Sequence, residues 1–229
     1  MKNRLNLDKE TLQIIFLTII SSALAGAFYF YRTNYLDLTY LEDNLFRALR
    51  MTCVYVILPF GWAWVFMKQR WVNFGIIKKN LIWSVIFGIG VYSIALVVFI
   101  LSLGNPDFDS AFRWGADYSL SDWILTLALV SWMAFVTDLW TRGFVLMLLT
   151  KYQSPMFGII GQNITWLVVH IYEIILLGLS MGIIGALGLT LTLGILGDVV
   201  ALKTKNIIGL GIGHIFLNIT FLSYVRMIG

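Results

Sequence analysis

The sequence has little charge: only 12% of its 229 residues are Asp, Glu, Lys or Arg. A soluble domain carries about a quarter charged residues, so this scarcity excludes an ordinary water-soluble fold. Hydrophobic residues make up 59% of the chain, and the mean hydropathy is +0.86. The nine Trp, ten Tyr and sixteen Phe fit the aromatic belts found at membrane interfaces. The composition is therefore that of a polytopic membrane protein.

Cysteine is almost absent as well. The single cysteine, Cys53, cannot form an internal disulfide, and its place in an apolar run predicts a packed, unreactive thiol. The net charge is +4, but no basic arm exists, which excludes a nucleic-acid partner. Internal repeats, low-complexity tracts and soluble domains are also missing. We therefore expect residues 1–229 to form a single integral membrane domain in the lipid bilayer.

Long apolar runs, in contrast, are plentiful. A spanning helix needs about 20 predominantly apolar residues. Seven stretches qualify: 11–31, 51–67, 81–103, 122–149, 155–176, 179–201 and 206–227. The first is too long for the apolar core of a signal peptide and is predicted to be a retained span. The intervening segment "TYLEDNLFRALR" is amphipathic and is predicted to lie flat on the membrane surface, as an eighth helix. We expect an all-α, polytopic membrane helix bundle of about seven transmembrane helices.

The distribution of Lys and Arg predicts the orientation in the cell membrane. Cytoplasmic loops carry an excess of these residues. If the N-terminus is cytoplasmic, ten of them lie inside: Lys2, Arg4, Lys9, Lys68, Arg70, Lys78, Lys79, Lys151, Lys203 and Lys205. Five lie outside: Arg32, Arg47, Arg50, Arg113 and Arg226. The loop 104–121, with Asp107, Asp109 and Asp117, then also lies outside.

A few polar residues interrupt the spans at similar depths. Each ionisable group at the bilayer centre costs about 2.5–3.5 kcal/mol on insertion scales, so such groups indicate a functional site when partners exist. At about 1.5 Å per residue, Asp138 lies roughly 17 Å, His170 about 22 Å and His214 about 12 Å from the inner ends of their spans, within about 7 Å of the middle of a ~30 Å core. His170 and His214 are the only histidines of the chain. The three side chains are thus expected to meet near the bilayer centre, in the part of the chain between residues 122 and 227.

Spacing along each helix suggests how these groups work. Asp138 and Arg142 are four residues apart and can pair, either as part of the site or as a structural clamp between helices. His214 and Asn218 also share one helical face and can together stabilise a developing oxyanion. A neutral imidazole at His170 can act as a base for water, although a single buried histidine can also serve only as an interhelical hydrogen-bond donor.

Four further polar residues have simpler interpretations. Gln162, Asn163 and Asp198 are expected to hold helices together or to lie at the interface. Glu173 follows His170 by one turn. It is expected to be a solvated interfacial residue, and the alternative is that it orients His170.

Three motifs together resemble a known family. "TDLWTRGFV", "WLVVH" ending at His170, and "KTKNIIGLGIGHIFLN" containing His214 and Asn218 match in order and spacing the CAAX-protease and bacteriocin-processing (CPBP, or Abi) intramembrane proteases, which are similar to the type II CAAX prenyl endopeptidase. The pattern of that family is Glu-Glu-x-x-x-Arg, then Phe-x-x-x-His, then His-x-x-x-Asn. Trp166 stands in place of the usual Phe.

The resemblance implies peptide-bond hydrolysis in a membrane cavity, without a cofactor. It assigns water activation to a first-motif Glu together with His170, the oxyanion donors to His214 and Asn218, and a supporting pair to Asp138 and Arg142. The first Glu is replaced by Thr137, whose hydroxyl cannot take a proton from water as a carboxylate does. Asp138 would then have to be recruited as the base.

Two functions follow from this substitution. The first is an intramembrane endopeptidase that acts on membrane-embedded or lipidated peptides or proteins, with Asp138, His170, His214 and Asn218 as catalytic residues. The second is an inactive relative that binds peptides as a bacteriocin-immunity or maturation-accessory protein. A transporter is disfavoured because repeated halves are missing. A divalent-metal site formed by Asp138, His170 and His214 is an alternative by ligand type alone.

Overall fold

The computed structural model describes residues 7–112 and 118–228. This part of the chain is helical and contains no strand, which confirms the predicted all-α class. The elements are α1 (Lys9–Tyr35), α2 (Tyr40–Met51), η1 (Thr52–Ile57), α3 (Leu58–Val65), η2 (Trp71–Phe74), α4 (Leu81–Ser102), α5 (Pro106–Ser110), α6 (Leu120–Asp138), η4 (Leu139–Leu146), α7 (Met147–Tyr152), α8 (Pro155–Val169), α9 (Ile171–Met181), α10 (Ile183–Thr204) and α11 (Ile208–Ile228). η1 and η4 are π-helical, whereas η2 is a 3-10 turn.

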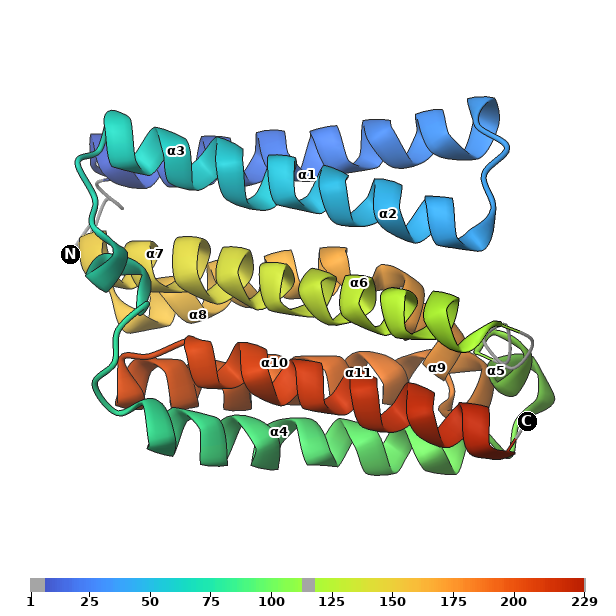
Figure 1. The fold of residues 1–229 in the computed structure, drawn as a ribbon. Helices are drawn as coiled ribbons and strands as arrows, with labels where there is room; N and C mark the ends of the chain where they lie inside the picture. The colour runs from blue at the N-terminus through green and yellow to red at the C-terminus, as the bar shows by residue number, and fades with distance from the viewer. Residues whose placement is uncertain (1–6, 113–117, 229) are drawn as a thin grey trace.

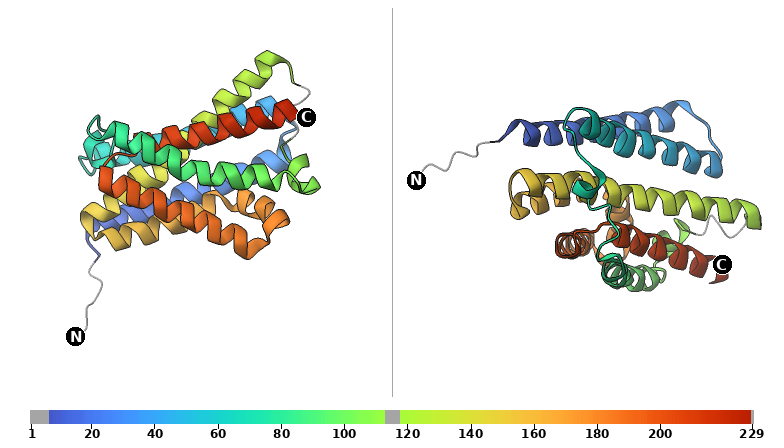
Figure 2. Two further views of the ribbon diagram at one scale, coloured as in Figure 1. Left: turned by 90° about the horizontal axis from the view of Figure 1, so that it is seen from below. Right: turned by 60° about the vertical axis from the view of Figure 1, so that its left-hand side comes forward.

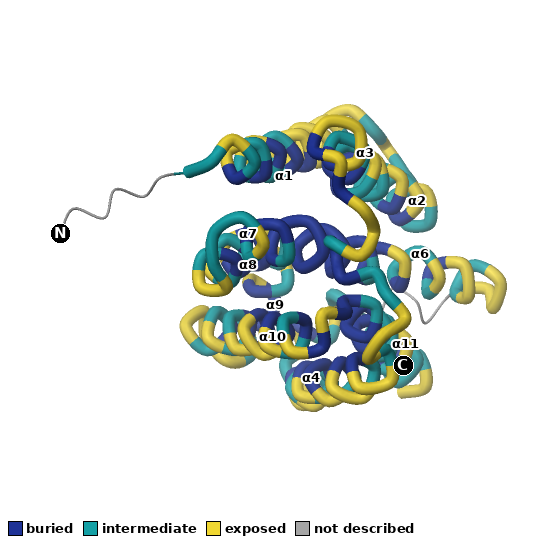
Figure 3. The backbone as a smooth tube through the Cα atoms, turned by 90° about the vertical axis from the view of Figure 1, so that its left-hand side faces the viewer, coloured by how far each residue is buried: buried dark blue, intermediate teal, exposed yellow. Residues whose placement is uncertain are grey.

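The helices form a bundle of three tiers (Figure 1). The hairpin of α1 with α2 and α3 is the first tier; α6, α7 and α8 form the middle one; α4, α10 and α11 form the third. The end-on view of Figure 3 shows buried residues concentrated in the middle tier, while the outer faces of the other tiers are exposed. Because the outer faces are apolar, they suit contact with lipid rather than water.

Among the described residues, six helices are long and apolar enough to cross a membrane, as expected for a multi-pass membrane protein. They are Lys9–Tyr35, Tyr40–Val65, Leu81–Ser102, Leu120–Tyr152, Ile183–Thr204 and Ile208–Ile228. The pair Pro155–Val169 and Ile171–Met181 makes a seventh if it counts as one span, but it is bent by 74°. The predicted number of about seven helices is therefore confirmed.

Two predicted boundaries are wrong. The stretch 155–176 is not one straight span, because α8 ends at Val169 and the chain turns at His170 (φ −102°, ψ 18°). The span predicted at 179–201 begins only at Ile183, because Gly182 adopts φ +76° and ends α9. Glycine reaches this left-handed region without a steric cost, so it provides the break.

The amphipathic segment is also different from the prediction. Thr39 caps α2 through a capping box with Glu42, and the helix then continues through η1 and α3 as one unit. Residues 40–51 are therefore the first half of the second long helix and not a separate surface helix, so the eighth helix does not exist. The π-turns of η1 directly precede Pro59, whose missing N–H and ring disrupt regular α-helical bonding.

Helices α4 and α11 approach each other very closely. A Cβ atom on Gly88 of α4 would collide with the backbone of Gly209, and one on Gly213 of α11 would collide with the backbone of Gly88. Small residues allow such backbone contact in membranes, where the hydrophobic effect does not drive helices together. Ser84 adds a hydrogen bond of 2.8 Å to the carbonyl of Asn206. This contact fixes α4 beside α11 and thereby the two faces that carry Tyr92 and His214.

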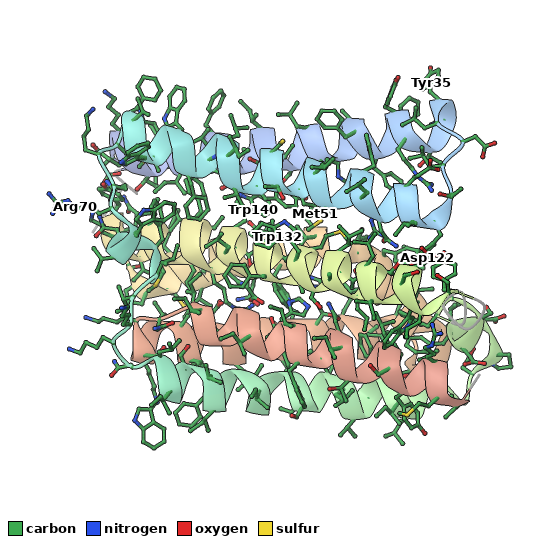
Figure 4. All side chains as sticks on the ribbon, viewed as in Figure 1. Tyr35, Met51, Arg70, Asp122, Trp132 and Trp140 are labelled. Atoms are coloured by element: carbon green, nitrogen blue, oxygen red, sulfur yellow. The ribbon has the colours of Figure 1, made fainter. Side chains whose placement is uncertain are left out.

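The start of α1 and the end of α11 lie at opposite ends of the bundle (Figures 1 and 2). Figure 4 shows Arg70 at the end where α1 begins and Tyr35 and Asp122 at the other end, with Met51, Trp132 and Trp140 between them. Several of the predicted cytoplasmic residues thus lie in loops of one end: Lys68, Arg70, Lys78, Lys79 and Lys205. Lys2, Arg4, Arg113 and Asp117 lie outside the described residues.

Cys53 differs from the prediction. It is a free thiol on the exposed side of η1 rather than a packed one. Arg47 and Arg50, expected in an external loop, lie in α2 within the second long helix.

Candidate functional site

Asp138 is the centre of the polar cluster. It is the last residue of α6, directly before the π-helical η4, and its side chain is buried. Its carboxylate accepts hydrogen bonds from the Tyr92 hydroxyl, at 2.9 Å on Oδ2 and 3.1 Å on Oδ1, and from Arg142 Nη1 on Oδ1. His214 Nδ1 lies 3.0 Å from Oδ2. Both carboxylate oxygens are therefore fully used by three neighbouring side chains.

Arg142 joins two carboxylates from different helices. Besides the pair with Asp138, its Nε lies 3.5 Å from Oδ1 of Asp198 on α10. The guanidinium also lies over the ring of Trp166, with Cζ 4.2 Å from the centroid, a cation–π arrangement. A Cβ atom on Gly197 would collide with the guanidinium, so glycine makes the space for it. A fully buried arginine is tolerated here because the carboxylates of Asp138 and Asp198 offset its charge, while its Nε makes no hydrogen bond among the described residues.

His214 projects from α11 into the same cluster. Its ring stacks on Tyr92, with centroids 4.5 Å apart and an interplanar angle of 12°. The Nδ1 contact with Asp138 uses one ring nitrogen and leaves Nε2 for other partners. A carboxylate on Nδ1 fixes both the tautomer and the rotation of the ring. Asp138 therefore holds the His214 ring in a fixed orientation on α11.

His170 lies beside His214, at the break between α8 and α9. The two imidazole centroids are 6.0 Å apart, with the planes inclined by 25°. The backbone carbonyl of Trp166 lies 2.9 Å from Nδ1 of His170 and accepts a hydrogen bond from it. A carbonyl can only accept, so Nδ1 carries the proton and Nε2 of the neutral ring is an acceptor. This is the form that a general base requires.

The side chains of Asn218 and Thr137 do not bond to the cluster around Asp138. Asn218 lies one turn beyond His214 on α11, is half-buried, and makes no hydrogen bond within the described part of the chain. Its amide is thus available to a ligand. The Thr137 hydroxyl is buried and donates to the carbonyl of Met133 at 2.9 Å in its own helix. Position 137 consequently offers no proton acceptor to His170.

Sequence reasoning missed Tyr92. Its hydroxyl is the only side-chain group from α4 that contacts Asp138 among the described residues, and it also accepts from Arg142 Nη1 at 3.1 Å. A signal was present: tyrosine belongs at membrane interfaces, and Tyr92 lies in the middle of an apolar span. Asn163 and Asp198, expected to join helices, do so through a hydrogen bond of 2.9 Å between α8 and α10.

The alternative metal site is not formed. No group of three or more His, Cys, Asp or Glu side chains among the described residues is arranged to hold a metal ion. The carboxylate of Asp138 accepts hydrogen bonds from Tyr92 and Arg142 and contacts Nδ1 of His214. The described side chains of the polar cluster thus form a hydrogen-bonded network.

Comparison with known proteins gives one match. Residues 119–220 match the family described as "Type II CAAX prenyl endopeptidase Rce1-like". The matched region contains Asp138, Arg142, His170, His214 and Asn218, and it begins after α4, which carries Tyr92. No curated protein and no solved structure shows a significant match to the chain.

Proposed function

We propose that this chain, whose residues 119–220 form a domain of the Rce1-like CAAX protease family, is an intramembrane endopeptidase that hydrolyses peptide bonds of membrane-embedded or lipidated substrates. The observation that supports it best is the pair of imidazoles, one buried and one half-buried, 6.0 Å apart, with Nδ1 of each ring held by a defined acceptor. Two histidines within membrane-spanning segments have little purpose in a protein that only packs against lipid.

In this proposal His170 takes part in activating the water. Its Nε2 faces no hydrogen-bond partner in the described structure, and Trp166 holds the opposite side of the ring. The water oxygen attacks the carbonyl carbon of the peptide bond while the proton passes to the base. The same proton is then delivered to the departing amine as the C–N bond breaks.

His214 and Asn218 stabilise the charge that develops on the carbonyl oxygen. They lie one turn apart on α11 and face the same way. Asp138 holds Nδ1 of His214, so that the ring directs Nε2 toward the oxyanion together with the amide of Asn218. Tyr92 and Arg142 keep Asp138 ionised and oriented. Asp138 is thus a positioning residue for His214, because recruiting it as the water base would break one of its three hydrogen bonds.

Thr137 supports a second candidate, a non-catalytic family member that binds peptides as an immunity or maturation-accessory protein. Position 137 carries a hydroxyl in place of the carboxylate expected at the first motif. This hydroxyl donates a hydrogen bond to the Met133 carbonyl. The two candidates differ in one measurable property, which is turnover.

The test is cleavage of a fluorescence-quenched, farnesylated peptide ending in a CAAX sequence by the full-length protein in liposomes. His170→Ala and His214→Ala should each lower kcat by about 10²-fold or more. Tyr172→Phe, an exposed neighbour of His170, is the matched control and should not change the rate. Equal rates for both histidine variants and the wild type, with all proteins folded, would refute the endopeptidase.

A further inference from the structure

The proposed endopeptidase needs a carboxylate beside His170. An imidazole alone accepts one proton, and the charge it gains is costly to bury without a counter-ion. Thr137 supplies none, and both oxygens of Asp138 are used by Tyr92, Arg142 and His214. A different acidic side chain must therefore complete the base if the chain is active.

Glu173 is the acidic residue that lies nearest to His170 along the sequence. It is the third residue of α9, whose N-cap is His170, and the side chains at these two positions lie on the same side of a helix start, as in a capping box. Its carboxylate oxygen Oε2 is buried and has no hydrogen-bond partner. Glu173 as a whole is half-buried, so one of its carboxylate oxygens is enclosed by the protein and is not bonded to any described group.

The break at His170 explains why this carboxylate is free. A glutamate at this helical position often bonds back to the backbone N–H that precedes the helix. Here the N–H of His170 donates instead to the carbonyl of Trp166 at 3.1 Å and closes α8. The N–H of Ile174 donates to the carbonyl of His170 at 2.9 Å and opens α9. The backbone around the bend thus satisfies itself without using the carboxylate of Glu173.

The bend between the two helices points to the same pair. The bend of 74° between α8 and α9 occurs at His170 itself, so the ring and the carboxylate lie where two helix segments meet. A water held between Nε2 of His170 and this carboxylate would have two acceptors.

We propose that Glu173 replaces the missing first-motif glutamate and forms, with His170, the base that activates the attacking water. This inference rests on the proposed endopeptidase function. One water proton passes to Glu173, the water oxygen bonds to the peptide carbonyl carbon, and His214 with Asn218 stabilises the resulting oxyanion. The proton on Glu173 then passes to the leaving nitrogen as the C–N bond breaks, which returns the carboxylate to its ionised form.

The kinetic test uses the same farnesylated CAAX peptide and liposomes. Glu173→Gln keeps the shape of the side chain and should lower kcat by about 10²-fold or more, because the proton acceptor is lost. Glu173→Asp should retain part of the rate. Adding Thr137→Glu to Glu173→Gln should restore activity, because a carboxylate at position 137 again provides a proton acceptor for the water. Such rescue is not expected if Glu173 only stabilises the fold.

A second measurement does not require turnover. Because the chain contains two histidines, its ring-labelled ¹⁵N spectrum in micelles has only His170 and His214 signals, which His214→Ala assigns. Glu173→Gln should move the ring signals of His170 and leave those of His214 nearly unchanged.

The outcomes separate this inference from the endopeptidase itself. If His170→Ala is inactive while Glu173→Gln cleaves at the wild-type rate, the endopeptidase stands and the role of Glu173 is wrong. Unchanged His170 signals in Glu173→Gln would also overturn the role of Glu173, whether or not a peptide is cleaved.

Discussion

Tyr92 and His214 stack nearly in parallel, with centroids 4.5 Å apart, while the hydroxyl of Tyr92 and Nδ1 of His214 both bond to Asp138. The three residues come from α4, α11 and the end of α6. Since α4 precedes the region that matches the family, the site is not confined to that region. The close glycine contact between α4 and α11 is what aligns the stacked rings.

Tyr92→Phe should therefore impair catalysis more than folding. The variant keeps the ring stack but removes the donor to a buried carboxylate, a hydrogen bond to a charged group worth about 1.5–3 kcal/mol. We expect a decrease of about tenfold or more in kcat, because each 1.36 kcal/mol corresponds to a factor of ten. Ser93→Ala is the control, because the Ser93 hydroxyl only donates to the Ile89 carbonyl in its own helix. Equal peptide cleavage by both variants would contradict this role of Tyr92.

Arg142→Met should destabilise the bundle. It leaves Asp138 and Asp198 as buried carboxylates without their cation, and breaking such a pair costs about 3–5 kcal/mol. The measurement is the unfolding midpoint in detergent together with the yield of inserted protein. Arg70→Met, at an exposed loop position, should leave both unchanged. If Arg142→Met unfolds at the wild-type midpoint, the pair does not act as a clamp.

Two glycines of α4 should respond oppositely to alanine. A methyl group on Gly88 would collide with the backbone of Gly209, whereas nothing lies within 4 Å of the position that a Cβ would occupy on Gly90. Gly88→Ala is expected to cost about 1–3 kcal/mol through overpacking. Gly90→Ala should be neutral or stabilise by up to about 1 kcal/mol, because alanine favours a helix. Thermal unfolding of both variants in the same detergent measures the difference.

Thr137→Glu should raise cleavage in the wild-type background. The substitution returns the glutamate that the family carries at the first motif, and general bases contribute about 10²–10⁴-fold. The gain from Thr137→Glu should be smaller in the wild-type background than in the Glu173→Gln background, because Glu173 already provides His170 with a carboxylate in the wild type. Thr137→Gln has the same size without the charge and should give no gain. A rate that rises equally with Gln and Glu would argue that volume, not basicity, matters at this position.

The orientation is testable with the single cysteine. In a Cys53→Ser background, Lys79→Cys and Asp107→Cys introduce exposed thiols at opposite ends of α4. The excess of Lys and Arg predicts that Lys79→Cys is labelled by an impermeant maleimide only after the cells are opened. Asp107→Cys should be labelled in intact cells. The reverse pattern would mean that the N-terminus of α1 lies outside.

The depth of the polar residues could be predicted from the sequence because helix rise is constant. Counting residues from the ends of the spans indicated that Asp138, His170 and His214 lie at one level, and the structure brings their side chains together. The long helices could also be predicted, because a spanning helix of constant rise needs an apolar run of a set length. What joins the residues is a matter of helix packing, for which a single sequence carries weaker signals.

The bend at His170 could not be predicted in this way. Proline and glycine, the usual helix breakers, are missing between Ile164 and Leu177. The apolar run therefore reads as one continuous span, although the contact between the His170 ring and the Trp166 carbonyl terminates α8 there. Tyr92 escaped notice for a related reason, because an aromatic residue in an apolar helix is usually only packed.

The π-helical segment η4 affects how the sequence of this helix should be aligned with the corresponding helix of other proteins. A π-bulge contains one more residue than the α-helical turn it replaces, so it shifts the phase of everything after it by about 100°. The faces that residues occupy around the helix axis therefore follow one periodicity before Leu139 and a shifted one after Leu146. One-residue insertions or deletions, which ruin most spanning helices, can be absorbed here. Comparisons of sequences should allow a gap within 139–146 and nowhere else in this helix.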